Sequence, residues 1–157
     1  MRNRQKGFSL IELLIVVAII LIIAAIAIPN LLRSRMAANE ASAVGSLRSI
    51  NTACVTYSTT YGTGYPVALA NLGPAAAASA ATADLIDSVL ALGIKSGYGF
   101  TYVAGAPDAA GNTNTYTITA IPVNIGTTGQ RQFFTNESGV IRANPSGAAD
   151  VNSTPIG

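Results

Sequence analysis

The sequence predicts an α+β fold in which a long N-terminal helix packs on a small antiparallel β-sheet. Residues 8–61 carry helical patterns throughout, whereas residues 98–143 contain short segments rich in aromatic and β-branched residues, separated by Gly, Asn and Pro. Of the 157 residues, 50% are hydrophobic and 10% are charged. This composition suits one modest core together with a segment that belongs in lipid.

The first part of the helix, residues 8–29, is long and apolar enough to cross a membrane. From Phe8 to Ile28 only Ser9 and Glu12 are polar, and a membrane-spanning helix needs roughly 20 residues. Three basic residues precede this segment, namely Arg2, Arg4 and Lys6. Positive charges stay on the cytoplasmic side, so we expect the C-terminal bulk of the chain to be exported.

A cleaved signal peptide is the alternative interpretation of the same residues. Residues 13–24 resemble the apolar core of such a signal, and residues 25–27 resemble a small-residue cleavage site. Glu12 favours a retained helix. A carboxylate costs about 2.5–3.5 kcal/mol at mid-membrane and somewhat less near the edge, and a disposable signal gains nothing from that cost. We therefore expect Glu12 to have a partner.

The second part of the helix, residues 30–61, is predicted to be amphipathic. Pro29 is expected to kink the helix between the two parts, because it lacks an N–H and its ring crowds the preceding turn. Apolar residues then recur at spacings of three, four and seven, namely Met36, Ala43, Leu47, Ile50, Cys54, Tyr57 and Tyr61. We expect the sheet to cover this stripe, and Asn39, Arg48 and Asn51 mostly to lie off it.

Beyond the helix, a connecting region over residues 62–97 leads to the predicted sheet over residues 98–143. The connection is expected to contain a short helix over residues 84–92, with Leu85, Val89 and Leu92 as its apolar face and Gly93 at its end. The predicted strands cover residues 98–103, 115–121, 132–135 and 140–142. Residues 136–139 predict a hairpin turn, with Gly139 able to adopt a positive φ. Residues 144–157 are expected to form a mobile tail.

Catalysis is not expected from this composition, and neither a cofactor nor a metal site is predicted. The chain has no His, and Cys54 is its single cysteine, so an intrachain disulfide is impossible. We expect Cys54 to act as a small buried hydrophobe, with an intersubunit disulfide as the alternative. Nine basic residues less the three at the head leaves six against seven acidic ones, and this balance disfavours nucleic-acid binding.

Three polar patterns in the sequence each have a functional and a simpler structural interpretation. Asp84 and Asp87 are expected to complement a helix dipole. The oxygen-rich loop that begins at Asp108 could bind calcium, but one carboxylate favours a plain turn. Asn136 and Asn152 both begin Asn-x-Ser/Thr patterns. Because Asp150 stands two positions before Asn152, as in the extended bacterial signal, Asn152 is the candidate for glycosylation.

Residues 6–12, followed by the apolar run to Ile28 and by Pro29, resemble the prepilin cleavage and methylation segment of type IV pilins and type II secretion pseudopilins. The resemblance implies that a prepilin peptidase removes residues 1–7 by cutting after Gly7, and that the amine of Phe8 is then methylated. It also implies a single-pass precursor in the bacterial inner membrane and dedicated assembly machinery. The mature chain is then expected to form a helical homo-oligomeric filament through its N-terminal helix.

Glu12 is expected to set the register of this filament. The new ammonium at Phe8 and the Glu12 carboxylate lie at nearly the same depth, and an unpaired charge in an apolar core is costly. The alternative is that Glu12 lies at the membrane boundary and reaches the headgroups.

The first functional hypothesis is a structural subunit of an extracellular type IV pilus. A periplasmic pseudopilin of a type II secretion system is the first alternative, and a membrane-tethered binding protein, such as a DNA-uptake pilin, is the second. Many pilins clamp a C-terminal loop with a disulfide. With Cys54 alone, this chain has no such loop, so the adhesive roles assigned to that loop are not carried over.

Overall fold

The computed structural model describes residues 8–156, which divide between two compact units, residues 8–35 and residues 36–156. Helix α1 (Leu10–Tyr61) contributes its first part to one unit and its remainder to the other. The leader predicted over residues 1–7, with Gly7 and the three basic residues, lies outside the described residues. α1 is uninterrupted at Pro29, and the kink predicted there stays a prediction.

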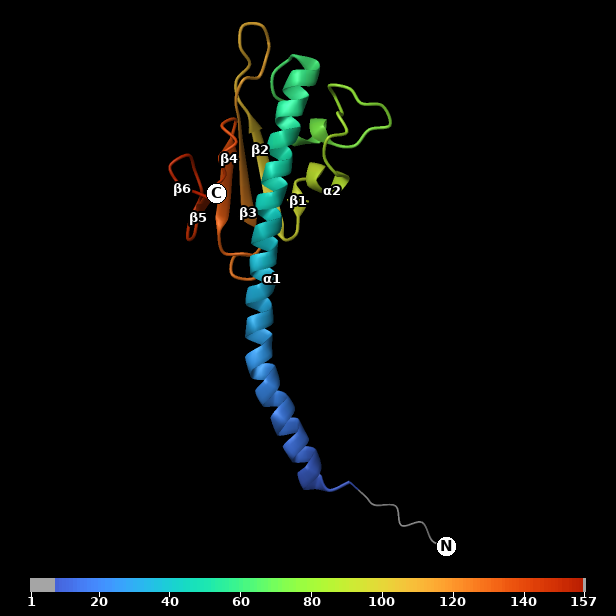
Figure 1. Cartoon of the computed structure of the whole chain (residues 1–157), viewed down its shortest axis with the longest axis vertical. Helices are drawn as coiled ribbons and strands as arrows, with labels where there is room; N and C mark the ends of the chain where they lie inside the picture. The colour runs from blue at the N-terminus through green and yellow to red at the C-terminus, as the bar shows by residue number, and fades with distance from the viewer. Residues whose placement is uncertain (1–7, 157) are drawn as a thin grey trace. The chain divides into compact units, whose positions relative to one another are not determined.

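The second unit contains a six-stranded sheet whose strands follow chain order, from β1 to β6 (Figure 1). Every neighbouring pair is antiparallel. The strands are β1 (Ile94–Lys95), β2 (Tyr98–Ala104), β3 (Tyr116–Pro122), β4 (Gln132–Asn136), β5 (Arg142–Asn144) and β6 (Thr154–Pro155). Such a meander requires only short connections.

One face of this sheet covers the predicted stripe of α1, which confirms the α+β fold class. On the helix, Ala43, Leu47, Ile50, Cys54 and Tyr57 are buried in the core. Side chains alternate along β3, so that Ile118 and Ala120 are fully buried while Thr117 is exposed. Strands β2 and β4 add Tyr98, Phe100 and Phe133 to the same core. The sheet thus buries one face against the helix.

Asn51 was expected to lie off the buried stripe, and that expectation is wrong. Its side chain is buried between α1 and the sheet, where Nδ2 donates to Thr135 Oγ1 at 2.9 Å and Oδ1 accepts from the Tyr116 hydroxyl at 3.1 Å. Nδ2 also lies 3.4 Å from the carbonyl oxygen of Gly139. A buried amide is tolerated here because its donors and acceptor are satisfied.

We expect Asn51→Leu to destabilise the second unit by about 1–3 kcal/mol, because it leaves the buried polar groups of Thr135 and Tyr116 without their partner. Thermal unfolding of the detergent-solubilised chain measures the effect. Ser49→Leu, at an exposed position two residues away on the same helix, is the control, and equal losses in the two variants would contradict this role for Asn51.

The short helix of the connecting region begins later than predicted. Helix α2 covers only Ser88–Ala91, with Asp87 as its N-cap accepting from the backbone N–H of Leu90. Asp84 has a φ of +55°, which is incompatible with a helix, and residues 83–86 donate their backbone N–H groups to the segment 71–73. The apolar face is also corrected, because Ile86 and Leu90 are buried whereas Val89 and Leu92 are exposed. A 3₁₀ turn, η1 (Leu69–Leu72), precedes this helix.

The C-terminal part of the sheet corrects two further expectations. The last predicted strand lies two residues later, as β5, and residues from Asn144 onward are not a free tail. β6 pairs with β5, and the backbone N–H of Ile156 donates to Ile141 at 2.9 Å. The two-residue strands β1 and β6 are too short for an alternating pattern to predict. The turn at residues 136–139 is confirmed, with Gly139 at a φ of +73°.

Candidate assembly segment

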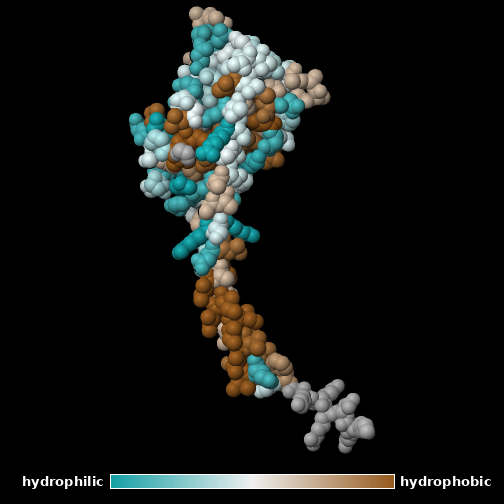
Figure 2. Space-filling view, viewed as in Figure 1, coloured by the Kyte–Doolittle hydropathy of each residue, from teal (hydrophilic) through white to brown (hydrophobic). Residues whose placement is uncertain are grey.

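The first part of α1 is an apolar helix that none of the described residues buries. Its large hydrophobic residues are all substantially exposed, from 46% at Val17 to 80% at Leu10. The visible surface of this segment is almost continuously hydrophobic (Figure 2). Among the described residues, α1 is the one helix that is long and apolar enough to cross a membrane. A signal sequence would also meet these criteria of length and composition. A helix that is apolar on all sides requires lipid or protein around it.

Glu12 lies in the first turn of α1 and faces its beginning. Its Oε2 accepts from the backbone N–H of Ser9 at 3.0 Å, an interaction that forms half of a capping box. The carboxylate therefore also complements the positive end of the helix dipole. The Ser9–x–x–Glu12 spacing is itself a capping signature that is visible in the sequence. Phe8 precedes the helix and is exposed.

The N-terminal residues match a defined protein family. Residues 2–28 match the family described as prokaryotic N-terminal methylation motif. This match covers Gly7, Phe8 and Glu12 together with the apolar run. The match is to this N-terminal segment and covers less than half of the chain.

This chain resembles several curated pilus components over part of its length. It is 68% identical over 40 residues, or 26% of its length and 30% of the relative's, to the type IV wide pilus major component PilA4 of Thermus thermophilus. It is 50% identical over 50 residues, 32% of its length and 23% of the relative's, to the type IV major pilin protein PilA of Myxococcus xanthus. The type IV major fimbrial protein FimA of Dichelobacter nodosus is 48% identical over 58 residues, 35% of this chain and 37% of the relative.

The resemblance to type IV pilins is thus confirmed for part of the chain. The matched regions span between 23% and 37% of the relatives' lengths. Most of the chain therefore lies outside these matched regions. In the second unit, one prominent contact was not predicted from the sequence.

That missed contact is made by Glu40, which joins α1 to the β3–β4 connection. Its Oε1 accepts from the backbone N–H groups of Gln130 at 2.9 Å and Arg131 at 3.1 Å, and its Oε2 lies 2.7 Å from Arg131 Nε. The Glu40 side chain is 11% exposed. Its helical position, three residues before Ala43 on the buried face, was the available signal.

The hydrogen bonds to Glu40 decide its protonation state. Burial by itself raises the pKa of this carboxyl, but the backbone N–H groups of Gln130 and Arg131 and the Arg131 guanidinium together hold the pKa below its usual value. Glu40 is consequently charged at neutral pH and fixes the β3–β4 connection on the helix.

Cys54 is fully buried in the core of the second unit, as predicted for a small hydrophobic residue. Burial raises the pKa of its thiol to about 12, and interactions with Tyr102 and Tyr116 only partly offset this. The reactive thiolate is therefore scarce at neutral pH.

We expect alkylation of Cys54 by iodoacetamide at pH 8 to be roughly a hundredfold or more slower in the native chain than in the urea-unfolded chain. Mass spectrometry of the adduct measures both rates. Equal rates, or a dimer band that disappears with reductant, would contradict the buried-thiol assignment.

The oxygen-rich loop at Asp108 is a turn. Asp108 Oδ1 accepts from the backbone N–H groups of Ala110 and Asn112, and Oδ2 accepts from Asn114 Nδ2. These hydrogen bonds hold the pKa of Asp108 below its usual range. Among residues 8–156 no group of three or more His, Cys, Asp or Glu side chains could hold a metal ion.

The two Asn-x-Ser/Thr patterns have different surroundings. Asn136 Oδ1 accepts from the backbone N–H and the hydroxyl of Ser138 within the hairpin turn. Asn152 is exposed, and its backbone N–H donates to Asp150. Asn152 remains the candidate for glycosylation, which stays a prediction.

Proposed function

We propose that this chain is the structural subunit of a type IV pilus and carries no enzymatic role. The observation that supports this most strongly is the match to an N-terminal methylation motif on a helix whose apolar surface stays exposed among the residues that the structure describes. The relatives are named as major components of pili and fimbriae, which favours an extracellular pilus over a periplasmic pseudopilus.

The apolar part of α1 explains two successive states of such a subunit. As a precursor in the inner membrane, the helix lies in lipid, with residues 2–6 on the cytoplasmic side. After a prepilin peptidase cleaves following Gly7, the same apolar surface is buried against the helices of other copies in the fibre. Both environments remove the hydrophobic residues from water, and this burial contributes a favourable free energy of about 25 cal/mol per Å² of apolar area.

The second unit forms the outer part of the proposed fibre. Its sheet and α1 build one core, with the exposed Thr101, Thr117 and Val103 on the opposite face of the sheet. Assembly would need no covalent link between subunits, because the single cysteine is buried.

Electron microscopy tests this proposal. Cells that express the chain with an epitope at the exposed Ala109, in the β2–β3 loop, should carry labelled surface filaments, and purified filaments should consist mainly of this chain by mass spectrometry. Labelled fibres confined to the periplasm would instead support a pseudopilin, and a tethered monomer would support a binding protein.

A further inference from the structure

Some charged side chains of the second unit form ion pairs within the chain, and others do not. Among residues 36–156 the structure contains two ion pairs, Glu40 with Arg131 and Asp87 with Lys95. Arg48 is exposed on α1, and Glu137 and Asp150 are exposed on the sheet side of the unit. None of these three has an ion-pair partner among the described residues of the chain. Complementary charges thus remain available on its own surface.

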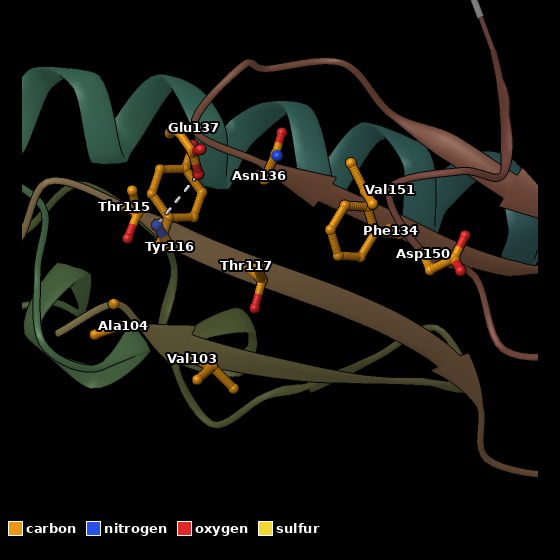
Figure 3. A pocket seen from close by; sticks show the side chains of 11 residues that line it. Val103, Ala104, Thr115, Tyr116, Thr117, Phe134, Asn136, Glu137, Asp150 and Val151 are labelled. Carbon is orange, nitrogen blue, oxygen red and sulfur yellow. Dashed lines mark hydrogen bonds between the residues drawn. The ribbon is translucent and has the colours of Figure 1, made fainter.

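Glu137 and Asp150 line a cleft on the face of the sheet that points away from α1 (Figure 3). Its floor is a cross-strand row in which Val103 on β2 opposes Thr117 on β3, and Thr117 opposes Asn136 on β4. These side chains alternate with Ile118 and Thr135, which point toward the helix. Figure 3 shows Glu137 beside Tyr116 at one end of the cleft and Asp150 with Val151 at the other end, across Phe134.

The cleft has the chemistry to receive an arginine side chain. Its volume is about 450 Å³, and Val103, Phe134 and Val151 give it an apolar lining between the two carboxylates. Arginine has an apolar stem that packs on such surfaces and a planar head that pairs with carboxylates. Arg48 of the same chain lies on the other side of the sheet, on the helix that the opposite face covers.

Arg48 and the cleft nevertheless lie at nearly the same level along α1. Asn51 donates to Thr135, which lies in β4 between the cleft residues Phe134 and Asn136. Arg48 is three residues before Asn51, or about 4.5 Å along the helix axis. Two copies side by side with parallel helices would therefore bring the helix face of one against the cleft of the next with little axial displacement.

We propose that Arg48 of one copy occupies the cleft between Glu137 and Asp150 of a neighbouring copy. This contact rests on the proposed filament and assigns a lateral interface to its outer part. It is heterologous, so each copy offers an arginine on one side and a cleft on the other, and the contact repeats along an open assembly.

Cysteine cross-linking in filaments tests the contact. The double variant Arg48→Cys with Glu137→Cys should give a ladder of covalent oligomers on denaturing gels after purified filaments are treated with a short bismaleimide. The spacer of this reagent replaces the length of the arginine side chain, because two cysteines at these positions are too far apart for a direct disulfide. Each single variant, and Arg48→Cys combined with Ala109→Cys in the exposed β2–β3 loop, should give none. Cys54 can stay in place, because it is buried.

A charge swap gives a second measurement if the cysteine variants do not assemble. R48E and E137R should each reduce filament yield several-fold, and the double variant should restore it toward the wild-type level. Three results would overturn the proposed contact but leave the proposed filament intact. The first is filaments of the double cysteine variant that give no ladder, and the second is an equally strong ladder from the Ala109 control. The third is a charge-swapped double variant whose filament yield is not restored. Absence of filaments from wild-type cells would overturn the proposed function itself.

Discussion

Glu12→Ala is expected to leave the chain in the membrane but to lower filament yield by about a hundredfold or more. We expect the mature amine of Phe8 to pair with this carboxylate in the apolar core of the fibre. Removing one member of a buried pair costs about 3–5 kcal/mol, and every 1.4 kcal/mol is a tenfold change in an association equilibrium. The apolar run that anchors the precursor is unchanged. Membrane fractionation and sheared-filament yield measure the two effects.

Glu12→Gln separates pairing from helix capping. The capping contact with the Ser9 N–H needs only an oxygen acceptor, which Gln supplies, whereas pairing with an ammonium needs the charge. We expect Gln to be nearly as defective as Ala in assembly. Wild-type filament yield from Glu12→Gln would show that capping, and not charge, is the role of this residue. Wild-type yield from both variants would remove Glu12 from assembly altogether.

Glu40→Ala is expected to destabilise the second unit by about 2–3 kcal/mol, because it removes a charged acceptor from two backbone N–H groups and a guanidinium. This expected loss of stability is smaller than the loss from breaking a fully buried ion pair, because the Arg131 side chain is 44% exposed and water can solvate it once it is unpaired. Thermal unfolding of the detergent-solubilised chain, followed by the near-UV circular dichroism of its tyrosines, measures the loss.

The exposed ion pair of the same unit provides the control. Lys95 and Asp87 are 2.8 Å apart, with side chains 35% and 48% exposed, and Lys95→Ala should lose far less stability than Glu40→Ala. Similar losses would mean that the burial of Glu40 is unimportant. Glu40→Gln should fall between the two, because an amide oxygen still accepts from backbone N–H groups but does not pair with a cation.

The contribution of Glu40 should also depend on pH. Its pKa is lower in the folded chain than the ordinary 4.5, so its stabilisation is complete above the unfolded pKa and is lost as the pH falls through the folded pKa. The stability difference between wild type and Glu40→Ala should be constant near pH 7 and shrink below about pH 4.5. A difference that grows on acidification would contradict the assignment.

Periodicity predicted the long elements of this fold. The helical stripe through Leu47, Ile50 and Cys54 identified the buried face of α1, because only a helix brings residues at these spacings together. Alternating aromatic and β-branched residues likewise located β2, β3 and β4 to within one residue at each end.

Contacts between distant segments were not predictable in the same way. Glu40 and Asn51 are polar, so residue type places them on the surface, and the partners that satisfy them are 65 or more positions away in the chain. The short strand β6 depends on β5 for its hydrogen bonds, and Asp84 is non-helical because of its backbone contact with Gly73. Tertiary hydrogen bonds override local propensity at these positions.

The assembly segment could be predicted more fully, because it is local. Gly7, Phe8, Glu12 and the apolar run are contiguous in the sequence, and their family match covers the same residues. Their proposed roles concern processing and contacts with neighbouring copies. The structure of a single chain gives the exposure of Phe8 and the capping contact of Glu12, but it contains no contact between subunits.

Mass spectrometry of the mature N-terminus tests the central claim most directly. Filaments purified from the surface of cells should contain a chain that begins at Phe8 with a methylated amine and retains the complete apolar run. A secreted chain that begins at Ile28, with an unmodified amine and no apolar segment, would contradict the account and would identify an ordinary signal peptide in its place.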